Sequence, residues 1–475
     1  MTMSTTPYLM TINGRGVATP DSIRVVNPAN GQVFERAPRA MTEHLDAAVD
    51  AARAAFPRWR ATSLEQRQAL LASCAAKIEE HADELTALFT REHGRPLAQA
   101  REEILGAAGW LKASRYLKVP VDVTEDSKTR RVEVHHEPLG VVCAIVPWNF
   151  PVLLAAWKIM PALLAGNTMV LKPSPFTPLC TLRIGALLGE VLPPGVLNVI
   201  CGGDELGPMM TAHPGFAKIT FTGSTKTGKR VMEAAARDLK RVTLELGGND
   251  ACIVMPDVNL DEVAESLFFG AFYNTAQVCV ATKRLYIHES IYDALRDRLH
   301  AIARKTKVGD GTEADTVFGP VQNRLQYRRV MDLLGDARAN GLKLLEGAPV
   351  PQGDGYFIPL TLVDNPPDDS RVVVEEAFGP VLPLLKFRDV DEVVERANRT
   401  EYGLAGAVWS ADVEQAKAIA HRLDTGTVWI NQNLQSTPFT PLAGHKQSGF
   451  GVENGVAGLL EFTVPKAIFI PKRAD

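Results

Sequence analysis

The chain has 475 residues, of which 46% are hydrophobic and 22% are charged, as expected for a globular protein of two or three domains. Its net charge is only −4 and it contains no long basic run, which argues against a nucleic-acid partner. The six cysteines stand singly, without CxxC or His-rich spacing. This pattern argues against a disulfide framework and a metal site, and it indicates a reducing compartment.

No targeting or membrane segment is predicted. Residues 1–10 lack the charged region and apolar stretch of a secretory signal. The most apolar run, 151–171, is interrupted by Lys158, Pro161 and Gly166, whereas a spanning helix needs about 20 largely uninterrupted apolar residues. We therefore expect a buried helix that leads into a strand, in a soluble, cytoplasmic protein with no membrane partner.

Residues from Thr42 to about Lys118 follow helical spacing and are rich in alanine, which predicts a helical layer. The composition then changes between Val119 and Glu137. Strict alternation over 131–135, after a turn at 126–128, predicts a solvated two-stranded hairpin. Such a ribbon is marginally stable alone. We expect it to pack on a partner subunit, with packing on its own domain as the alternative.

Four short apolar segments follow, each succeeded by a helical one, and this rhythm predicts an α/β fold with a parallel sheet covered on both faces. The four segments are 141–146, 168–171, 196–200 and 218–221. Ligands of such sheets bind at the carboxyl ends of the strands. Trp148, Lys172, Gly203 and Gly223 follow the four segments in turn, so this end of the sheet is predicted to form a nucleotide-binding cleft.

The run from Gly223 to Lys229 nearly matches the phosphate-binding Walker loop. That loop needs a hydroxyl group at the next position to hold magnesium, and Arg230 does not supply one. The simpler prediction is a phosphate site at a helix N-terminus, with Gly223 allowing close approach. No GxGxxG fingerprint follows the first strand of this region.

A cysteine and a carboxylate predict covalent catalysis. Asn259 can cap a helix whose apolar residues repeat at three-and-four spacing up to Phe272, so Cys279 is expected on a short loop behind a packed helix. Upstream, the strand 242–246 places Glu245 on the face opposite Leu246. A thiol attacks only as the thiolate, so the site must supply a base, a positive charge or helix-terminal N–H groups.

A second alternating set of strands predicts another α/β domain, which carries Cys279. Its strands are expected at 251–255, 285–288, 408–409 and 427–431. Taken alone, each site residue also has a structural explanation: the cysteine could be a core residue, Asn149 could cap the following helix, and Lys172 could lie in solvent at a strand end.

At this point the chain resembles the aldehyde dehydrogenase superfamily of NAD(P)-dependent enzymes, nearly from end to end. The resemblance rests on an ordered set of motifs: Pro147-Trp148-Asn149-Phe150-Pro151, Lys172-Pro173-Ser174, Phe221-Thr222-Gly223-Ser224, Leu244-Glu245-Leu246-Gly247-Gly248, Gln277-Val278-Cys279, Glu376-Ala377-Phe378-Gly379-Pro380 and Ser448-Gly449-Phe450-Gly451.

The resemblance implies a Rossmann-like cofactor domain (1–118 and 137–247) and a catalytic domain (248–447). It also implies an oligomerisation segment with the C-terminal tail (119–136 and 448–475), in a homodimer or homotetramer. The implied reaction is oxidation of an aldehyde to its acid through a cysteine thiohemiacetal and thioester.

In the implied mechanism Cys279 attacks the aldehyde, and the Asn149 amide with the Cys279 backbone N–H stabilises the oxyanion. Glu245 is then the general base for hydrolysis, a role that burial suits by raising a carboxyl pKa toward neutrality. Glu453 matches a second carboxylate linked to proton exit.

For the cofactor, the resemblance implies contacts from Trp148, Lys172, Ser174, Gly203, Gly223, Ser224, Thr227, Leu246, Glu376 and Phe378. Family members usually carry Glu three residues after the ribose-binding lysine, and here that position is Pro175. The absence of this glutamate removes a barrier to NADP binding but adds no positive group that would bind the 2′-phosphate. We therefore expect NAD as the cofactor, and use of NADP stays open. Ala276 replaces a glycine often found before Gln-x-Cys, which predicts a stiffer loop.

The implied aldehyde tunnel is apolar and contains no arginine that could bind a carboxylate, which favours an aliphatic or aromatic aldehyde. Its residues are Phe150, Leu154, Trp157, Val278, Val280 and Leu442. The alternatives are a semialdehyde dehydrogenase and a CoA-acylating enzyme, although Glu245 favours hydrolysis over transfer to CoA. From other classes, a nucleotide hydrolase at Gly223–Lys229 and a catalytically silent structural protein stay open.

Overall fold

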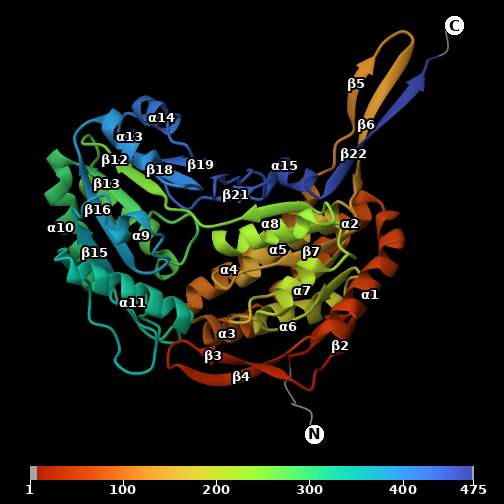
Figure 1. Cartoon of the computed structure of the whole chain (residues 1–475), viewed down its shortest axis with the longest axis horizontal. Coiled ribbons are helices and arrows are strands. Elements are labelled where there is room, and N and C mark those ends of the chain that lie inside the picture. Colours follow the sequence, from red (N-terminus) through yellow and green to blue (C-terminus); the bar gives the residue numbers. More distant parts are fainter. Residues whose placement is uncertain (1–7, 473–475) are drawn as a thin grey trace.

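The computed structural model describes residues 8–472, in which strands and helices form two α/β units and a projecting ribbon (Figure 1). The larger sheet has the strand order β2-β1-β9-β8-β7-β10-β11-β21, and the run from β9 to β11 is parallel. Its strands are β1 (Met10–Ile12), β2 (Arg15–Val17), β7 (Val141–Ile145), β8 (Thr168–Lys172), β9 (Leu197–Val199), β10 (Lys218–Thr222), β11 (Arg241–Glu245) and β21 (Gly449–Phe450).

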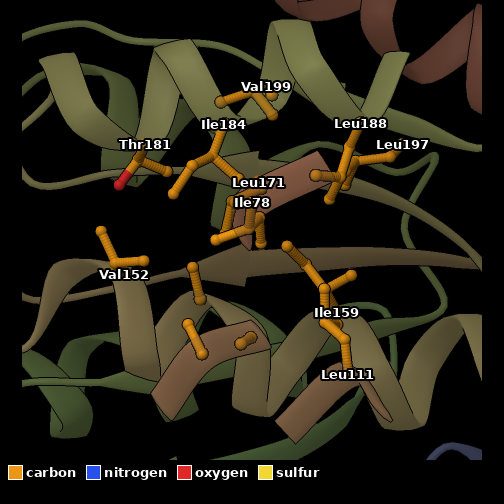
Figure 2. Close-up of a pocket in the computed structure, with 14 residues that line it drawn as sticks. Ile78, Leu111, Val152, Ile159, Leu171, Thr181, Ile184, Leu188, Leu197 and Val199 are labelled. Atoms are coloured by element: carbon orange, nitrogen blue, oxygen red, sulfur yellow. The ribbon is translucent and has the colours of Figure 1, made fainter. Parts of the chain in front are cut away.

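Helices cover both faces of this sheet. The Thr168 hydroxyl donates to the carbonyl of Ala52 in α1, whereas Leu171, three residues further along β8, points to the other face toward α5 and α6. Figure 2 shows Leu171 among apolar side chains of α2, α4, α5, α6 and β9. The helices are α1 (Thr42–Arg60), α2 (Leu64–Glu80), α3 (Ala82–His93), α4 (Leu97–Ala113), η1 (Ser114–Tyr116), α5 (Pro151–Leu164), α6 (Leu179–Gly189), α7 (Leu206–Ala212) and α8 (Thr225–Ala236).

The second sheet has the order β14-β15-β16-β13-β12-β18-β19 and is parallel except for β14. The predicted fold class, α/β with two parallel sheets, is therefore confirmed. Its strands are β12 (Ala251–Val254), β13 (Arg284–His288), β14 (Leu344–Glu346), β15 (Thr361–Asp364), β16 (Val381–Phe387), β18 (Ala405–Trp409) and β19 (Thr427–Ile430). Its helices are α9 (Leu260–Phe272), α10 (Glu289–Lys305), α11 (Arg324–Ala339), α12 (Arg371–Val374), α13 (Val390–Asn398) and α14 (Val413–Ala420).

Several short strands were not predicted. β1 and β2 extend the first sheet antiparallel to its edge, and two small two-stranded sheets stand apart. The latter are β3 (Ser22–Asn27) with β4 (Gln32–Pro38), and β17 (Tyr402–Gly403) with β20 (His445–Lys446). Their residues mix charged and apolar side chains without regular alternation, so their pairing depends on tertiary contacts.

The predicted hairpin forms, but it has a third strand. β5 (Asp122–Asp126) and β6 (Arg130–Pro138) are joined by β22 (Thr463–Pro471), which pairs with β6 over its whole length. The two-stranded expectation missed β22, because a strand so distant in sequence gives no local signal. Figure 1 shows this ribbon projecting from the body of the molecule. Phe469 is 64% exposed there.

The last part of the chain before the ribbon returns to the larger sheet. β21 pairs with β11 next to Glu245, and the short helix α15 (Gly455–Leu460) leads into β22. The proposed division into domains stays a prediction, and residues 1–7 and 473–475 of its terminal ranges lie outside the described residues. Among 8–472, no helix is both long enough and apolar enough to cross a membrane.

Candidate active site

Cys279 lies on a loop behind α9, as predicted. Asn259 caps this helix by accepting the N–H of Asp261 at 3.1 Å. After α9 the chain passes through the short 3₁₀ segment η2 (Tyr273–Ala276), where three consecutive residues are left-handed: φ is 53° at Asn274, 55° at Thr275 and 60° at Ala276. Only glycine adopts this region without cost. The loop is therefore strained, and Ala276 adds to that strain.

Glu245 ends β11 and faces the thiol of Cys279. The Glu245 side chain is buried, and neither carboxylate oxygen has a hydrogen-bond partner of normal geometry among the described residues. Burial raises the pKa of the Glu245 carboxyl to about 8, while the nearby Cys279 thiol opposes the rise. Burial and then the Glu245 carboxyl raise the pKa of the Cys279 thiol well above its ordinary value. The two groups therefore compete for one negative charge.

Asn149 follows β7 and contacts the cysteine loop directly. Its Nδ2 donates to the carbonyl of Gln277 at 3.1 Å, and Nδ2 of Asn274 donates to the same carbonyl at 3.2 Å. The Asn149 backbone carbonyl accepts from Asn274 (3.1 Å), from His93 Nε2 (3.0 Å) and from Arg95 Nη2 (2.6 Å). These bonds fix both the backbone that carries Asn149 and the loop that carries Cys279.

A buried ion pair holds this network in place. Arg95 Nη1 donates to Glu103 Oε2 at 2.5 Å, and both side chains are about 1% exposed. The other Glu103 oxygen accepts the N–H groups of Val152 and Leu153, in the first turn of α5, where a negative charge is favourable. Arg95 also lies over the ring of Phe150, 4.4 Å from its centroid. Neither Arg95 nor Glu103 was predicted as a site residue, because neither lies in one of the motifs.

We expect Arg95→Met to destabilise the protein by about 3 to 5 kcal/mol, since it leaves the Glu103 carboxylate buried without its cation. Urea unfolding measures the loss. The matched control is Lys112→Met, which breaks a half-exposed ion pair with Glu79 and should cost less than about 1 kcal/mol. Equal losses in the two variants would contradict this account of the Arg95 pair.

Glu453, the predicted second carboxylate, lies near Glu245. Its Oε1 accepts from Lys158 Nζ at 2.8 Å and lies 3.4 Å from the Thr220 hydroxyl, and the Lys158–Glu453 pair is buried. Both charges act on Glu245: Lys158 lowers the pKa of its carboxyl and Glu453 raises it. Lys158 was noted in the sequence only as a break in an apolar run, although a lysine inside a buried helix is itself a signal of a paired charge.

The residues predicted to hold the adenosine and phosphates lie at the carboxyl ends of β8, β9 and β10. Lys172 is buried, and the only hydrogen bond of its Nζ among described residues is to its neighbour's carbonyl, at 3.2 Å. Burial lowers the pKa of Lys172. Ser224 caps α8 by accepting the Thr227 N–H at 3.3 Å. A Cβ at Gly223 would lie 2.5 Å from the ring of Phe221, so no side chain fits there.

The remaining cofactor candidates lie around Glu376. Its Oε1 accepts the Gly248 N–H at 3.2 Å. Phe378, which has a left-handed φ of 48°, packs edge-on against Trp148 with ring centroids 5.4 Å apart. Leu246 donates its backbone N–H to Ser448 and packs against Gly228 of α8. The two other candidates belong to the carboxyl ends of β8 and β9: Ser174 is buried and its hydroxyl accepts the Phe176 N–H at 3.3 Å, and Gly203 follows β9.

The structure brings the six predicted tunnel residues together with Cys279 in one pocket of about 460 Å³. They are Phe150, Leu154, Trp157, Val278, Val280 and Leu442. Tyr273 and Trp429, which were not predicted, add aromatic walls, and Glu102 adds a carboxylate that accepts the Tyr273 hydroxyl at 3.2 Å. No lysine or arginine is among the described residues that line it.

Comparison with known proteins agrees with this geometry. Residues 17–468 match the model of the aldehyde dehydrogenase family. The chain is 45% identical to a probable aldehyde dehydrogenase of a Pseudomonas species, covering 99% of this chain and 96% of that protein. It is 38% identical to phenylacetaldehyde dehydrogenase of Pseudomonas fluorescens, with 98% and 96% covered.

Among solved structures, betaine aldehyde dehydrogenase from Staphylococcus aureus in complex with NAD⁺ superposes with a TM-score of 0.93. The two chains are 33% identical, and the match covers 98% of this chain and 95% of the other. The chain thus belongs to the aldehyde dehydrogenase family and is an NAD(P)-dependent aldehyde dehydrogenase.

Proposed function

We propose that the enzyme oxidises an apolar aldehyde to its carboxylic acid through a thioester on Cys279. The observation that carries the proposal is the position of Cys279 between a mostly apolar pocket and a buried carboxylate, Glu245, whose oxygens have no hydrogen-bond partner of normal geometry among residues 8–472. The thiolate adds to the aldehyde carbonyl and gives a thiohemiacetal, and loss of a hydride from its carbon to the cofactor would convert this adduct to the thioester. Glu245 then takes a proton from water, which attacks the resulting thioester and releases the acid.

Asn149 is the proposed side-chain donor to the oxyanion. One N–H of its amide is bound to the Gln277 carbonyl, which orients the group, and the second has no other acceptor among the residues that the structure describes. The Cys279 backbone N–H is the other proposed donor. The role of the Arg95 network is then to hold these donors in place before substrate arrives, since preorganised donors stabilise charge at no reorganisation cost.

The cofactor residues fit a nicotinamide dinucleotide. A buried lysine with few partners, a glycine that leaves no room for a side chain and a capped helix N-terminus are suited to ribose and phosphate groups. A nicotinamide dinucleotide held by these residues would supply the acceptor for the hydride that leaves the substrate carbon. Glu376 is the proposed acceptor for ribose hydroxyls, and the aromatic pair of Trp148 and Phe378 supports a nicotinamide site beside it.

We infer a preference for NAD. Pro175 removes the usual acidic residue, but the Glu205 carboxylate lies so close to Gly203 that a Cβ there would be 2.5 Å from it. Glu205 is paired with Arg39 at 2.7 Å, and it also acts electrostatically on Lys172. A carboxylate at this end of the cleft disfavours the 2′-phosphate of NADP.

The pocket supports an uncharged aliphatic or aromatic aldehyde. Its wall combines Phe150, Trp157, Tyr273 and Trp429 with aliphatic side chains, and the charged groups among its described lining residues are carboxylates such as Glu102. This lining repels a second carboxylate on the substrate and so disfavours a semialdehyde of a dicarboxylic acid. The similarity to phenylacetaldehyde dehydrogenase is in keeping with an aromatic substrate.

We also propose that the three-stranded ribbon joins subunits into a homodimer or homotetramer. Ile468, Phe469 and Ile470 of β22 are between 38% and 64% exposed, and the outer edge of β22 is unpaired among the described residues. Apolar side chains and a free edge on a projecting ribbon are suited to burial against another copy of the chain.

The test of the proposed function is a panel of aldehydes assayed with NAD and NADP in parallel, following reduced nicotinamide. Apolar aldehydes with NAD should give the highest kcat/KM, and dicarboxylic semialdehydes much lower values. Product analysis with and without coenzyme A separates hydrolysis from acylation. If no aldehyde is oxidised with either cofactor, or if the product is an acyl-CoA, the proposal is wrong.

A further inference from the structure

Lys283 stands four residues after Cys279, where the cysteine loop enters β13. Its side chain is only 7% exposed. The ammonium group donates to the Cys279 backbone carbonyl and lies 3.4 Å from Glu376 Oε1. One buried cation thus touches both the backbone of the proposed nucleophile and the carboxylate proposed to bind the cofactor.

Asp250, just before β12, is an acidic residue close to this cation. It is buried, and its Oδ2 has no hydrogen-bond partner among the described residues. Its backbone carbonyl accepts the N–H groups of Lys283 and Arg284, at 3.0 and 3.1 Å. Gly248 separates the acid from the loop: a Cβ there would lie 2.6 Å from Asp250 Oδ1 and 3.1 Å from the Cys279 carbonyl. Gly248 therefore lies against both the Asp250 carboxylate and the Cys279 carbonyl to which Lys283 donates.

The charged groups around the thiol act in opposite directions. Glu245, from β11, and Asp250, from the segment before β12, both raise the pKa of the Cys279 thiol, and Lys283 lowers it. Glu376 and the Lys158–Glu453 pair act on Glu245. Burial alone also disfavours the thiolate, so a cation on the loop itself favours ionisation of the nucleophile.

We propose that Lys283 is a positioning residue for Cys279, which holds the backbone of the cysteine loop and supplies the positive charge that favours the reactive thiolate, with Asp250 as the opposing charge. The inference rests on the proposed function only in taking Cys279 as the nucleophile. Glu376 limits the effect because it shares the same ammonium group.

The experiment measures the thiol directly, in the full-length protein without aldehyde or cofactor. The rate at which iodoacetamide alkylates Cys279 is followed by mass spectrometry across pH, and the other five cysteines are buried. In Lys283→Met the pH midpoint of alkylation should rise by about 1 to 3 units relative to wild type. Lys283→Arg should restore a midpoint close to wild type, and Asp250→Asn should move it lower.

Opposite shifts in Lys283→Met and Asp250→Asn, with kcat reduced and the KM for aldehyde retained in the former, support the inference. A midpoint unchanged in Lys283→Met, or shifts of the same sign in both variants, overturns it. If Lys283→Met does not fold, Asp250→Asn decides alone, since an unchanged or higher midpoint there contradicts the opposing-charge role. Wild-type protein that alkylates as expected but oxidises no aldehyde would instead defeat only the proposed function.

Discussion

Replacing Cys279 with alanine is expected to lower kcat for aldehyde oxidation by a factor of at least about 10⁴, because the proposed reaction has no other nucleophile. The fold should survive, since the Cys279 side chain is only partly buried beside the pocket and makes none of the bonds that fix its loop. Those bonds include the ones made by Asn149, Asn274 and Lys283. Release of reduced nicotinamide, measured with saturating apolar aldehyde and NAD, gives the rate.

The matched control is Cys74→Ala, which removes a thiol of the same size from α2, inside the core of the first unit. This variant should lose stability from the cavity it leaves but keep its kcat. Retention of more than a small fraction of activity by Cys279→Ala, with the control active, would mean that the aldehyde is not held as a thioester on this residue.

The sequence predicted those parts of the fold that leave a local pattern. The helix before Cys279 has its cap, its acidic first turn and its apolar stripe within one stretch, and the structure places α9 within those limits. The buried strands β7, β8 and β10 are short, mainly apolar runs with Gly, Asn or Lys at one or both of their ends. Such segments contain the information for their own structure, so tertiary context had little to override.

The features that the sequence did not predict join residues that are far apart along the chain. β22 pairs with β6 across more than 300 residues, and nothing near Phe469 marks it as the third strand of a ribbon. The network around Asn149 has the same origin. Arg95 and Glu103 lie close together at the start of α4, but Asn149 and Asn274 are far away along the chain, and each is a common polar residue until folding buries it.

The parts of the candidate site differ in how completely the sequence predicted them. Cys279 and Glu245 were predicted from a loop and a strand end, and the structure places them in electrostatic contact. Only one member of the buried Lys158–Glu453 pair was predicted as a site residue. Glu453 matches a family motif, whereas Lys158 was interpreted only as a break in an apolar run. The catalytic and cofactor roles stay predictions that variants must test.

Replacing Glu245 with glutamine is expected to uncouple the two halves of the reaction. Thiolate attack and hydride removal do not use the proposed base, so rapid mixing should still give a burst of reduced nicotinamide close to one equivalent per active site. Hydrolysis of the thioester should then fall by about 10² to 10⁴, the usual contribution of a general base. Loss of the burst itself would show that Glu245 is also required to ionise Cys279.

The pH profile separates the base from a structural role for Glu245. Burial raises the pKa of its carboxyl to about 8, so the wild-type steady-state rate should rise with pH through about 8 as the carboxylate forms, and this limb should be absent in Glu245→Gln. The same shift affects stability with the opposite sign. Between about pH 4.3, where the unfolded carboxyl loses its proton, and about pH 8, the folded protein binds more protons, so its free energy of unfolding falls as pH rises.

Glutamine at position 245 removes this pH-dependent fall in the free energy of unfolding, because an amide does not ionise. Glu245→Gln is therefore expected to be at least as stable as wild type at pH 8, while Glu453→Gln, which leaves the buried Lys158 without its partner, should be less stable. If Glu245→Gln has a lower turnover rate than wild type but unfolds at a higher urea concentration, the Glu245 carboxylate serves catalysis and lowers the stability of the fold. If Glu245→Gln is less stable than wild type at pH 8, this carboxylate supports the structure through contacts other than those described.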